Sequence, residues 1–229
     1  MRRNLLAAAR LVAVAIVLSN AAAEAAPTIR YNWDRCEPFV RNQDYAGPGV
    51  YAQTLSITGL PAGTTWLLLS IDVLVAPWYR AWEFYDGGCA GAARLAVVPR
   101  VAGCDSIPGL AVAIAQLTHP YDYGANRIEI ECVLDPSFAP DPSRRYGVVT
   151  IAFDHELAET NCEGAGAPLC FLFLPGSAVY LAAGTYDIVA PENDRLTWND
   201  HSLEPDCSLR MTPLPVRQST WGQVKVLYR

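Results

Sequence analysis

Residues 50–76 read VYAQTLSITGLPAGTTWLLLSIDVLVA, and this stretch decides the fold class. It holds two apolar runs, at 50–60 and 64–76, and the tripeptide PAG separates them. Proline and glycine at such a break end one strand and turn the chain toward the next. The second run ends in its turn at Pro77. The pattern predicts two consecutive β-strands joined by a turn.

The same pattern continues along the chain. Gly, Pro, Asn or Asp stands in nearly every gap between the later apolar runs, which are ARLAVVP, GLAVAIAQL, NRIEIECVL, YGVVTIAF, PLCFLFL, SAVYLA, GTYDIVA and RLTW. No run before the tail has a sustained helical period, and strands do not alternate with helices, which argues against a doubly wound nucleotide-binding fold. We therefore predict an all-β protein, an antiparallel β-sandwich of jelly-roll or immunoglobulin-like type with about nine to eleven strands.

The first 30 residues, MRRNLLAAARLVAVAIVLSNAAAEAAPTIR, have the order of a secretory signal peptide: paired arginines, an apolar run and small residues. The apolar run is shorter than the roughly 20 residues that a membrane-spanning helix needs. We place cleavage after Ala25, with Ala23 as the alternative. The expected organisation is a signal peptide at 1–25, a β-sandwich at 26–210, and a linker with a short tail helix at 211–229. We therefore expect a secreted or cell-envelope protein whose mature chain has no transmembrane anchor.

The charge balance narrows the possible partners. Removal of the signal peptide leaves 14 basic and 22 acidic residues, a net charge of −8. The basic residues are scattered, and the longest basic run is Arg144-Arg145. Nucleic acids require a clustered positive surface. We therefore expect no nucleic-acid binding, and a protein or a glycan outside the cytoplasm remains the expected partner.

An export signal makes disulfides the default interpretation of the seven cysteines. Spacing predicts two local bridges, Cys162–Cys170 and Cys89–Cys104, each around one short segment. A third bridge, Cys36–Cys207, would join the two ends of the domain, and Cys36–Cys132 is the alternative. Strand alternation places Cys132 on one face with Ile128 and Ile130, so we predict a small buried thiol there.

No motif in the chain predicts catalysis, a metal or a cofactor. HELAET at 155–160 begins like a zinc-protease helix, but Glu159 stands where the second histidine is required. Glu192 and Asp194 would suit calcium, although turn formation explains the same residues. The alternative function is a secreted hydrolase that acts through loop groups, for which Glu83, Asp86 or His155 are the candidates.

Residues 77–89 read PWYRAWEFYDGGC, and five of the eight residues from Trp78 to Tyr85 are aromatic. Two interpretations are open. The rings can form a platform for a ligand, in which case Trp78, Tyr79, Trp82 and Tyr85 are the candidate ligand-binding residues. They can also pack as a plug over one end of the sandwich, because each large ring buries roughly 150–250 Å². Packing is the favoured interpretation, and Trp78, Tyr79 and Tyr85 are the rings expected to stay exposed.

Three segments together resemble cohesin modules. ITGLPAGTTWLLLSIDV is similar to the strand pair near the start of a cohesin, and YGVVTIAFDHEL to the strand before its last hairpins. PLCFLFLPGSAVYLAAGTYDIVAPENDRLTW is similar to the C-terminal half. The resemblance covers about two thirds of the chain and implies a jelly-roll sandwich that binds a partner or a carbohydrate without catalysis. The aromatic insertion and the extra cysteines depart from it, so no functional residue is carried over.

The last 19 residues, MTPLPVRQSTWGQVKVLYR, differ from the rest of the chain. Two prolines indicate an extended linker, and Thr220 with Gln223 fits a helix-capping box. Trp221, Val224 and Leu227 then recur at helical spacing. The segment STWGQVKVLYR resembles short C-terminal tails of assorted secreted bacterial proteins. It is interpreted either as a docking or sorting helix or as a helix that packs on its own sandwich. The function that the whole sequence favours is a secreted, non-catalytic binding or structural module.

Overall fold

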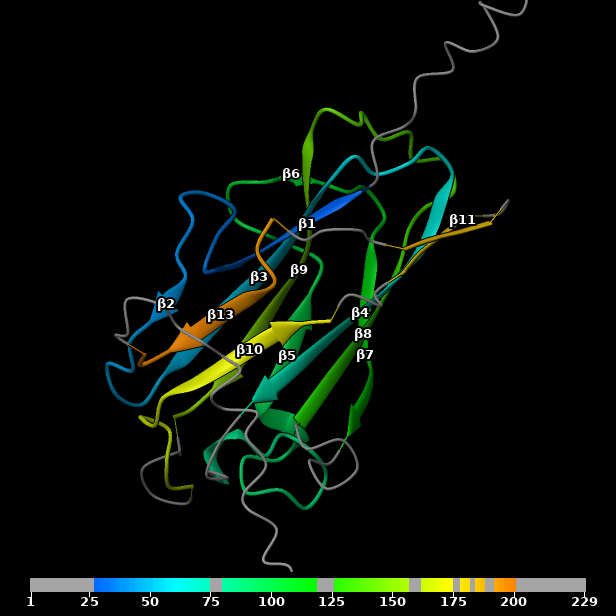
Figure 1. The fold of residues 1–229 in the computed structure, drawn as a ribbon. Coiled ribbons are helices and arrows are strands. Elements are labelled where there is room, and N and C mark those ends of the chain that lie inside the picture. The colour runs from blue at the N-terminus through cyan, green and yellow to red at the C-terminus, as the bar shows by residue number, and fades with distance from the viewer. Residues whose placement is uncertain are drawn as a thin grey trace, which may run out of the picture.

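The computed structural model describes residues 27–74, 80–118, 126–156, 162–174, 178–181, 184–187 and 192–200. Within these ranges the chain forms thirteen strands and two 3-10 helices, η1 (Arg80–Trp82) and η2 (Ala92–Arg94). The strands form two sheets that pack face to face (Figure 1). The predicted disulfide-stapled, all-β sandwich is therefore confirmed. The predicted signal peptide and the predicted tail helix lie outside the described residues.

The first sheet contains five of the described strands. β1 (Thr28–Trp33), β3 (Val50–Thr58), β9 (Arg145–Asp154) and β5 (Leu95–Val98) follow one another antiparallel, and β6 (Asp105–Ser106) pairs in parallel with β9. The register of β3 against β9 shifts between Leu55 and Ser56. This bulge leaves Val148 as an extra residue, and Val148 and Val149 are both fully buried. A bulge of this kind bends the strand and turns consecutive side chains toward the core.

The second sheet contains the other eight described strands. Its order is β12 (Gly184–Asp187), β11 (Ala178–Leu181), β4 (Thr64–Leu74), β10 (Leu169–Phe173), β13 (Arg195–Trp198) and β2 (Asn42–Gln43); β8 (Asn126–Val133) pairs with β4, and β7 (Ala111–Thr118) with β8. β4 is the long central strand. β8 lies along one of its edges, while β10 and β11 share the other.

The core lies between the two sheets and follows the strand alternation. On β4 the inward side chains are apolar and fully buried, namely Leu67, Leu69, Ile71 and Val73. β8 alternates without a break, so Cys132 shares the inner face with Ile128 and Ile130. The predicted buried thiol at Cys132 is confirmed. Burial, together with the charge of Glu131, raises the pKa of this thiol to about 12, so the thiol is protonated and unreactive at neutral pH.

The disulfides differ from the predicted pairs. Cys36 bonds to Cys104 and Cys89 bonds to Cys162, with Cα–Cα distances of 5.5 and 5.7 Å. The predictions Cys89–Cys104, Cys162–Cys170 and Cys36–Cys207 are wrong, and so is the alternative Cys36–Cys132. Each bridge instead joins segments about 70 residues apart, with sequence separations of 68 and 73.

Backbone contacts explain the observed pairing. The Cys36 amide donates to the carbonyl of Ala102 at 2.9 Å, which brings Cys36 beside Cys104. The Ala81 amide donates to the carbonyl of Glu163 at 3.2 Å, which brings the aromatic insertion beside Cys162. A disulfide requires neighbouring Cα atoms, and the fold rather than short sequence spacing supplies them here.

No helix in the described ranges is long and apolar enough to cross a membrane.

Candidate functional site

The aromatic insertion is the first candidate, and its central ring is buried. Trp82 belongs to η1 and is 0% exposed. Its ring packs edge-on against Trp198 at 5.0 Å and Phe171 at 5.4 Å between centroids. Its carbonyl accepts a hydrogen bond from the Asn126 side chain at 2.8 Å. Trp82 therefore plugs the end of the sandwich, as the favoured interpretation expects, and does not serve as a ligand platform.

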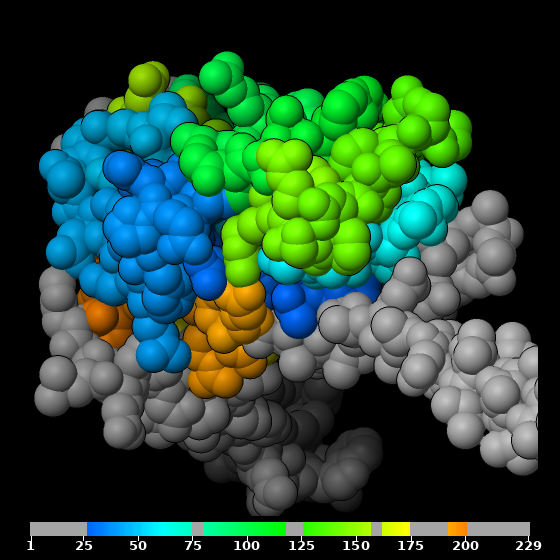
Figure 2. Space-filling view, turned by 90° about the horizontal axis from the view of Figure 1, so that it is seen from above, coloured from blue at the N-terminus to red at the C-terminus, as the bar shows by residue number. Residues whose placement is uncertain are grey.

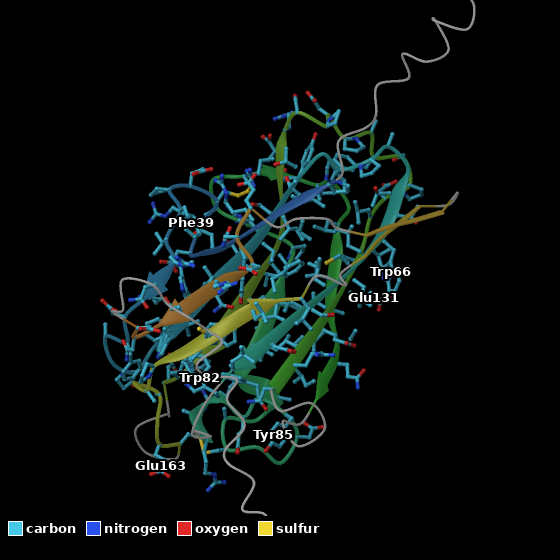
Figure 3. All side chains as sticks on the ribbon, viewed as in Figure 1. Phe39, Trp66, Trp82, Tyr85, Glu131 and Glu163 are labelled. Carbon is cyan, nitrogen blue, oxygen red and sulfur yellow. A yellow bond between two sulfur atoms is a disulfide. The ribbon has the colours of Figure 1, made fainter. Side chains whose placement is uncertain are left out.

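The other ring candidates give no ligand platform within the described residues. Trp78 and Tyr79 lie outside them. Tyr85 is half-buried and lines an apolar cavity together with Phe84. That cavity measures about 10 Å³, which is the space of a single water molecule and far too small for a sugar ring. Figure 3 shows Trp82 and Tyr85 near the same end of the sandwich.

His155 lies in the same aromatic end. It is 1% exposed, and its ring centroid is 4.4 Å from that of Trp82, 5.7 Å from Trp198 and 5.8 Å from Phe84. Burial lowers the pKa of His155 to about 4, although the charge of Asp154 opposes this shift. Its Nε2 atom has no hydrogen-bond partner. His155 is therefore a neutral core residue at neutral pH.

The burial of His155 predicts that acid lowers the free energy of unfolding. The pKa of His155 is lower in the folded chain than its ordinary value of 6.5. Its contribution to stability is therefore complete above pH 6.5 and is lost as the pH falls toward 4. We expect unfolding free energies in urea at pH 7 and pH 4 to differ by about 3 kcal/mol from this group. In His155→Phe that part of the pH dependence should vanish, while the carboxylate contributions remain. An unchanged difference between the two pH values would contradict this assignment.

The three groups of the hydrolase hypothesis have different surroundings. The Glu83 carboxylate accepts the Cys89 amide at 3.4 Å and lies 3.8 Å from the Arg80 side chain. Asp86 is exposed, and no hydrogen bond or ion pair joins Glu83, Asp86 and His155 within the described residues. In those residues, His, Cys, Asp and Glu also form no group of three or more that is arranged to hold a metal.

The carboxylates considered for calcium are held by arginines. Glu192 accepts hydrogen bonds from Arg30, at 2.7 Å, and from Arg145. Burial raises the pKa of Glu192, but these hydrogen bonds outweigh it and hold the pKa below its usual range. Asp194 is bound by Arg195 at 2.9 Å. The positive side chains of Arg30 and Arg145 beside the Glu192 carboxylate disfavour the binding of a cation. These ion pairs therefore stabilise the fold and do not form a calcium site. In Figure 2 the blue, orange and yellow-green segments that contribute these residues lie side by side.

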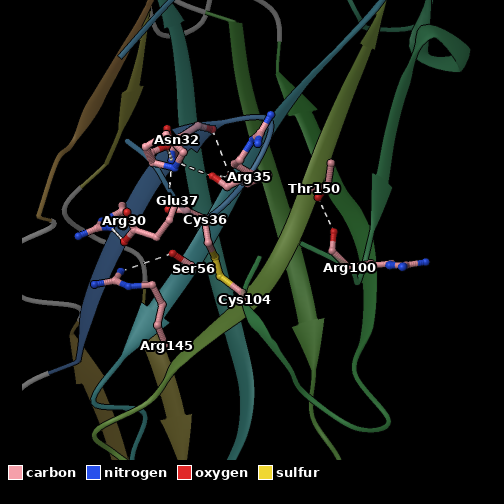
Figure 4. Close-up of a disulfide and its surroundings, with 12 residues drawn as sticks. Arg30, Asn32, Arg35, Cys36, Glu37, Ser56, Arg100, Cys104, Arg145 and Thr150 are labelled. Carbon is pink, nitrogen blue, oxygen red and sulfur yellow. Dashed lines mark hydrogen bonds and ion pairs between the residues drawn. A yellow bond between two sulfur atoms is a disulfide. The ribbon is translucent and has the colours of Figure 1, made fainter. Parts of the chain in front are cut away.

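A loop covers part of the outer face of the first sheet. Asn32 holds residues 34–40 there: its amide nitrogen donates to the carbonyls of Arg35, Cys36 and Pro38, and its oxygen accepts the Val40 amide. The Cys36–Cys104 disulfide then ties this loop to residues 99–106 (Figure 4). A cavity of about 320 Å³ lies beside the bridge, and among the described residues that line it Arg100 is the one with a charge. This face therefore offers little continuous sheet surface to a partner.

The outer face of the second sheet is different along β4, β8 and β7. The register aligns three rows across these strands: Trp66, Val133 and Ala111; Leu68, Glu131 and Ala113; Ser70, Glu129 and Gln116. Val133 is 49% exposed, and all three β7 side chains are exposed. We call these nine residues the binding face. Trp66 and Glu131, on neighbouring strands, lie on the same side of the molecule in Figure 3.

The charge of the binding face is negative. Within the described residues, neither Glu129 nor Glu131 forms an ion pair. The row after Glu129 contains Asp72 and Arg127. It adds no net negative charge, because Arg127 binds Asp72 through two hydrogen bonds of 2.8 and 3.2 Å. The surface thus runs from an apolar row through two acidic rows to a neutralised pair. The sequence analysis did not predict this surface, because strand alternation shows which side chains share a face but not which strands lie side by side.

Comparisons with known proteins give a likeness of fold. No protein-family model matches the chain, and no curated protein matches its sequence. A type II cohesin domain from the cellulosome of Acetivibrio cellulolyticus is 9% identical, with a TM-score of 0.42 over 76% of this chain and 96% of the cohesin. The sixth cohesin of scaffoldin B from the same organism, solved in complex with a Cel5 dockerin, is 10% identical, with a TM-score of 0.40 over 75% and 98%.

A type I cohesin from Clostridium thermocellum, solved with a dockerin, is also 10% identical, with a TM-score of 0.39 over 77% of this chain and 97% of that chain. These cohesins are thus distant from this chain both in sequence and in structure.

Proposed function

We propose that this protein is an exported, non-catalytic module that binds a protein partner on the binding face. The observation that carries the proposal is the three-by-three array on β4, β8 and β7, in which a half-buried tryptophan and two exposed apolar residues form a row that adjoins two glutamates. Protein interfaces combine an apolar centre that contains an aromatic residue with a polar rim. The array has this composition.

The shape of the face favours a protein over a glycan. Ala111 and Ala113 are small, so a partner backbone can approach the sheet closely along β7. Trp66 is the only aromatic residue of the nine and is half-buried, so these nine residues contain no row of exposed rings for stacking on sugars. Two glutamates without arginine partners within the described residues favour a basic surface on the partner.

The disulfides support the exported location. Two bridges and a fifth disulfide-bonded cysteine, Cys170, occur in a chain that begins with a predicted signal peptide. Disulfides persist in oxidising compartments and are rare in the cytosol. We therefore place the module in the cell envelope or the extracellular space.

The test uses the mature protein immobilised as bait for the exported protein fraction of its source cells. We expect a captured protein whose binding weakens about 30-fold in Trp66→Ala, as for the loss of a central aromatic contact of about 2 kcal/mol. Glu131→Lys should weaken capture further and remove most of its salt dependence. The affinities are measured by surface plasmon resonance with the captured protein.

Val98→Ser is the matched control, since Val98 is 46% exposed on β5 of the other sheet. It should leave binding unchanged. Capture that Trp66→Ala and Glu131→Lys do not affect, or that Val98→Ser abolishes equally, would refute the assignment of the face. Retention on cellulose or chitin that depends on Trp66 would show a glycan-binding module instead.

A further inference from the structure

The binding face ends at a long strand that has one neighbour. Among the described strands that pair with a single other strand, β7 is the longest, with eight residues. It pairs with β8 on one side (Figure 1). In an antiparallel strand, every second residue turns its amide and its carbonyl toward the opposite edge. Residues 111–117 form no further backbone hydrogen bond with the rest of the described chain, so this edge is open.

The other edges among the described strands are short or covered. β5 and β12 have four residues each, and β2 and β6 have two. Along β1, the Glu192 amide donates to the Ile29 carbonyl at 2.8 Å. The Asn193 side chain accepts the Tyr31 amide at 3.3 Å. Short strands, covering segments, charged residues and prolines protect edges from pairing with other chains. Residues 111–118, AVAIAQLT, contain no charged residue and no proline.

The two faces of the β7 edge favour different side chains on an added strand. On the inner face, Val112, Ile114 and Leu117 are partly buried and pack against the core. Apolar side chains of an added strand would cover them and extend the core. On the outer face, Ala113 lies in the same row as Glu131. The alanine side chain is too short to separate the Glu131 carboxylate from a strand added beside β7.

The charge beside the edge favours a basic occupant. Neither Glu129 nor Glu131 forms an ion pair within the described residues. A strand added to β7 would lie two strand spacings, about 10 Å, from β8. A lysine or arginine on its outer face has a long stem that can cross Ala113 toward Glu131. A second copy of this chain would bring its own β7, which has no charged residue, and would leave both glutamates unmatched.

We propose that the open edge of β7 pairs with an extended basic segment of the partner, in which apolar residues alternate with lysine or arginine. The apolar residues meet Val112 and Ile114, and the basic residues face Glu131. Main-chain hydrogen bonds supply affinity and the alternate side chains supply specificity. The register shift after Ile114 leaves Ala115 unpaired, so regular pairing runs from Ala111 to Ile114. This inference rests on the proposed function, because it names the part of the partner that meets the binding face.

The first test uses a synthetic eight-residue peptide in which valine and lysine alternate, with blocked ends and a fluorescent label. We expect the mature protein to bind it about 10-fold more tightly than the matching valine–glutamate peptide, measured by fluorescence anisotropy. N-methylation of the valine amides and N-methylation of the lysine amides block opposite edges of the peptide. One of the two should abolish binding and the other should leave it nearly unchanged. Equal effects of the two methylations, or equal binding of the two peptides, would overturn the proposal.

A matched pair of variants locates the pairing. Ala113→Lys puts a positive charge on the outer face of β7 beside Glu131, and it should weaken binding of the lysine peptide about 10-fold. Ala96→Lys puts the same charge at an exposed position of β5 in the other sheet, and it should leave binding unchanged. The amides of residues 111–114 should also exchange hydrogen more slowly in the complex. Equal effects of the two variants, or unprotected amides at 111–114, would contradict pairing at β7.

Failure of this inference is distinguishable from failure of the proposed function. A captured protein that depends on Trp66 and Glu131, but that the lysine peptide does not displace, would overturn the edge pairing and leave the binding face assigned. If no protein is captured, the proposed function fails, and the peptide measurements still decide whether β7 binds a basic strand. A dimer in light scattering that Ala113→Lys dissociates would identify a second copy as the occupant and overturn the proposal.

Discussion

Replacement of Trp82 by alanine is expected to lower the free energy of unfolding by about 3–5 kcal/mol, the usual cost of removing a fully buried tryptophan. The reason is that Trp82 fills the end of the sandwich and contacts rings from both sheets, Phe153 of the first and Phe171 and Trp198 of the second. No neighbouring side chain is free to collapse into the space, because these rings are themselves 0% exposed. Urea denaturation followed by circular dichroism measures the change.

Trp66→Ala is the matched control for this substitution. Trp66 is only half-buried on the outer face of β4, so its loss should cost clearly less than the loss of Trp82. If the two substitutions destabilise the chain equally, or if Trp82→Ala costs less than 1 kcal/mol, Trp82 is not the plug of the core.

Removal of the Cys89–Cys162 bridge is expected to have an effect of similar size. The bridge closes a loop with a sequence separation of 73 residues, for which the chain-entropy model gives about 4 kcal/mol. The double variant Cys89→Ser/Cys162→Ser should therefore unfold at a much lower urea concentration than the wild type. The Cys36→Ser/Cys104→Ser variant should behave similarly, because its loop has a separation of 68 residues.

The observed pairing also distinguishes variants that remove equal numbers of cysteines. Cys89→Ser/Cys104→Ser removes one cysteine from each of two bridges, so it should cost more than either matched double variant and leave Cys36 and Cys162 as free thiols. A stability equal to that of the matched variants, with no free thiol, would support the locally predicted pairs and contradict the structure.

The binding face shows how much of a candidate site strand alternation can predict. The alternation NRIEIECV already indicates that Glu129, Glu131 and Val133 share one side of a strand. It does not indicate that Trp66 is their neighbour, because β4 meets β8 through pairings of residues far apart in the chain. The consecutive strand β7 is closer in sequence, but its register against β8 shifts between Ile114 and Gln116, which the alternation of β8 does not indicate. The register between neighbouring strands decides which side chains form an array on a sheet. The sequence of one strand does not specify that register.

The aromatic insertion at 77–89 shows a second limit of prediction from sequence. Its composition is equally suited to a ligand platform and to a core plug, since both use large rings. The choice is made by the segments that close around it: the Asn126 side chain holds the Trp82 carbonyl, and the Glu163 carbonyl accepts the Ala81 amide. These contacts span 44 residues and about 80 residues of sequence, beyond any local pattern.

The sequence by itself determined what depends on neighbouring residues. Apolar alternation specified the strands and the inward position of Cys132, and prolines and glycines specified the breaks, because backbone preferences and side-chain direction act over a few residues. Only the tertiary structure decided the disulfide partners, the burial of Trp82 and His155, and the rows of the binding face. Each of these depends on which distant segments share a layer, and that choice is made by the burial of the whole apolar surface at once rather than by any single stretch.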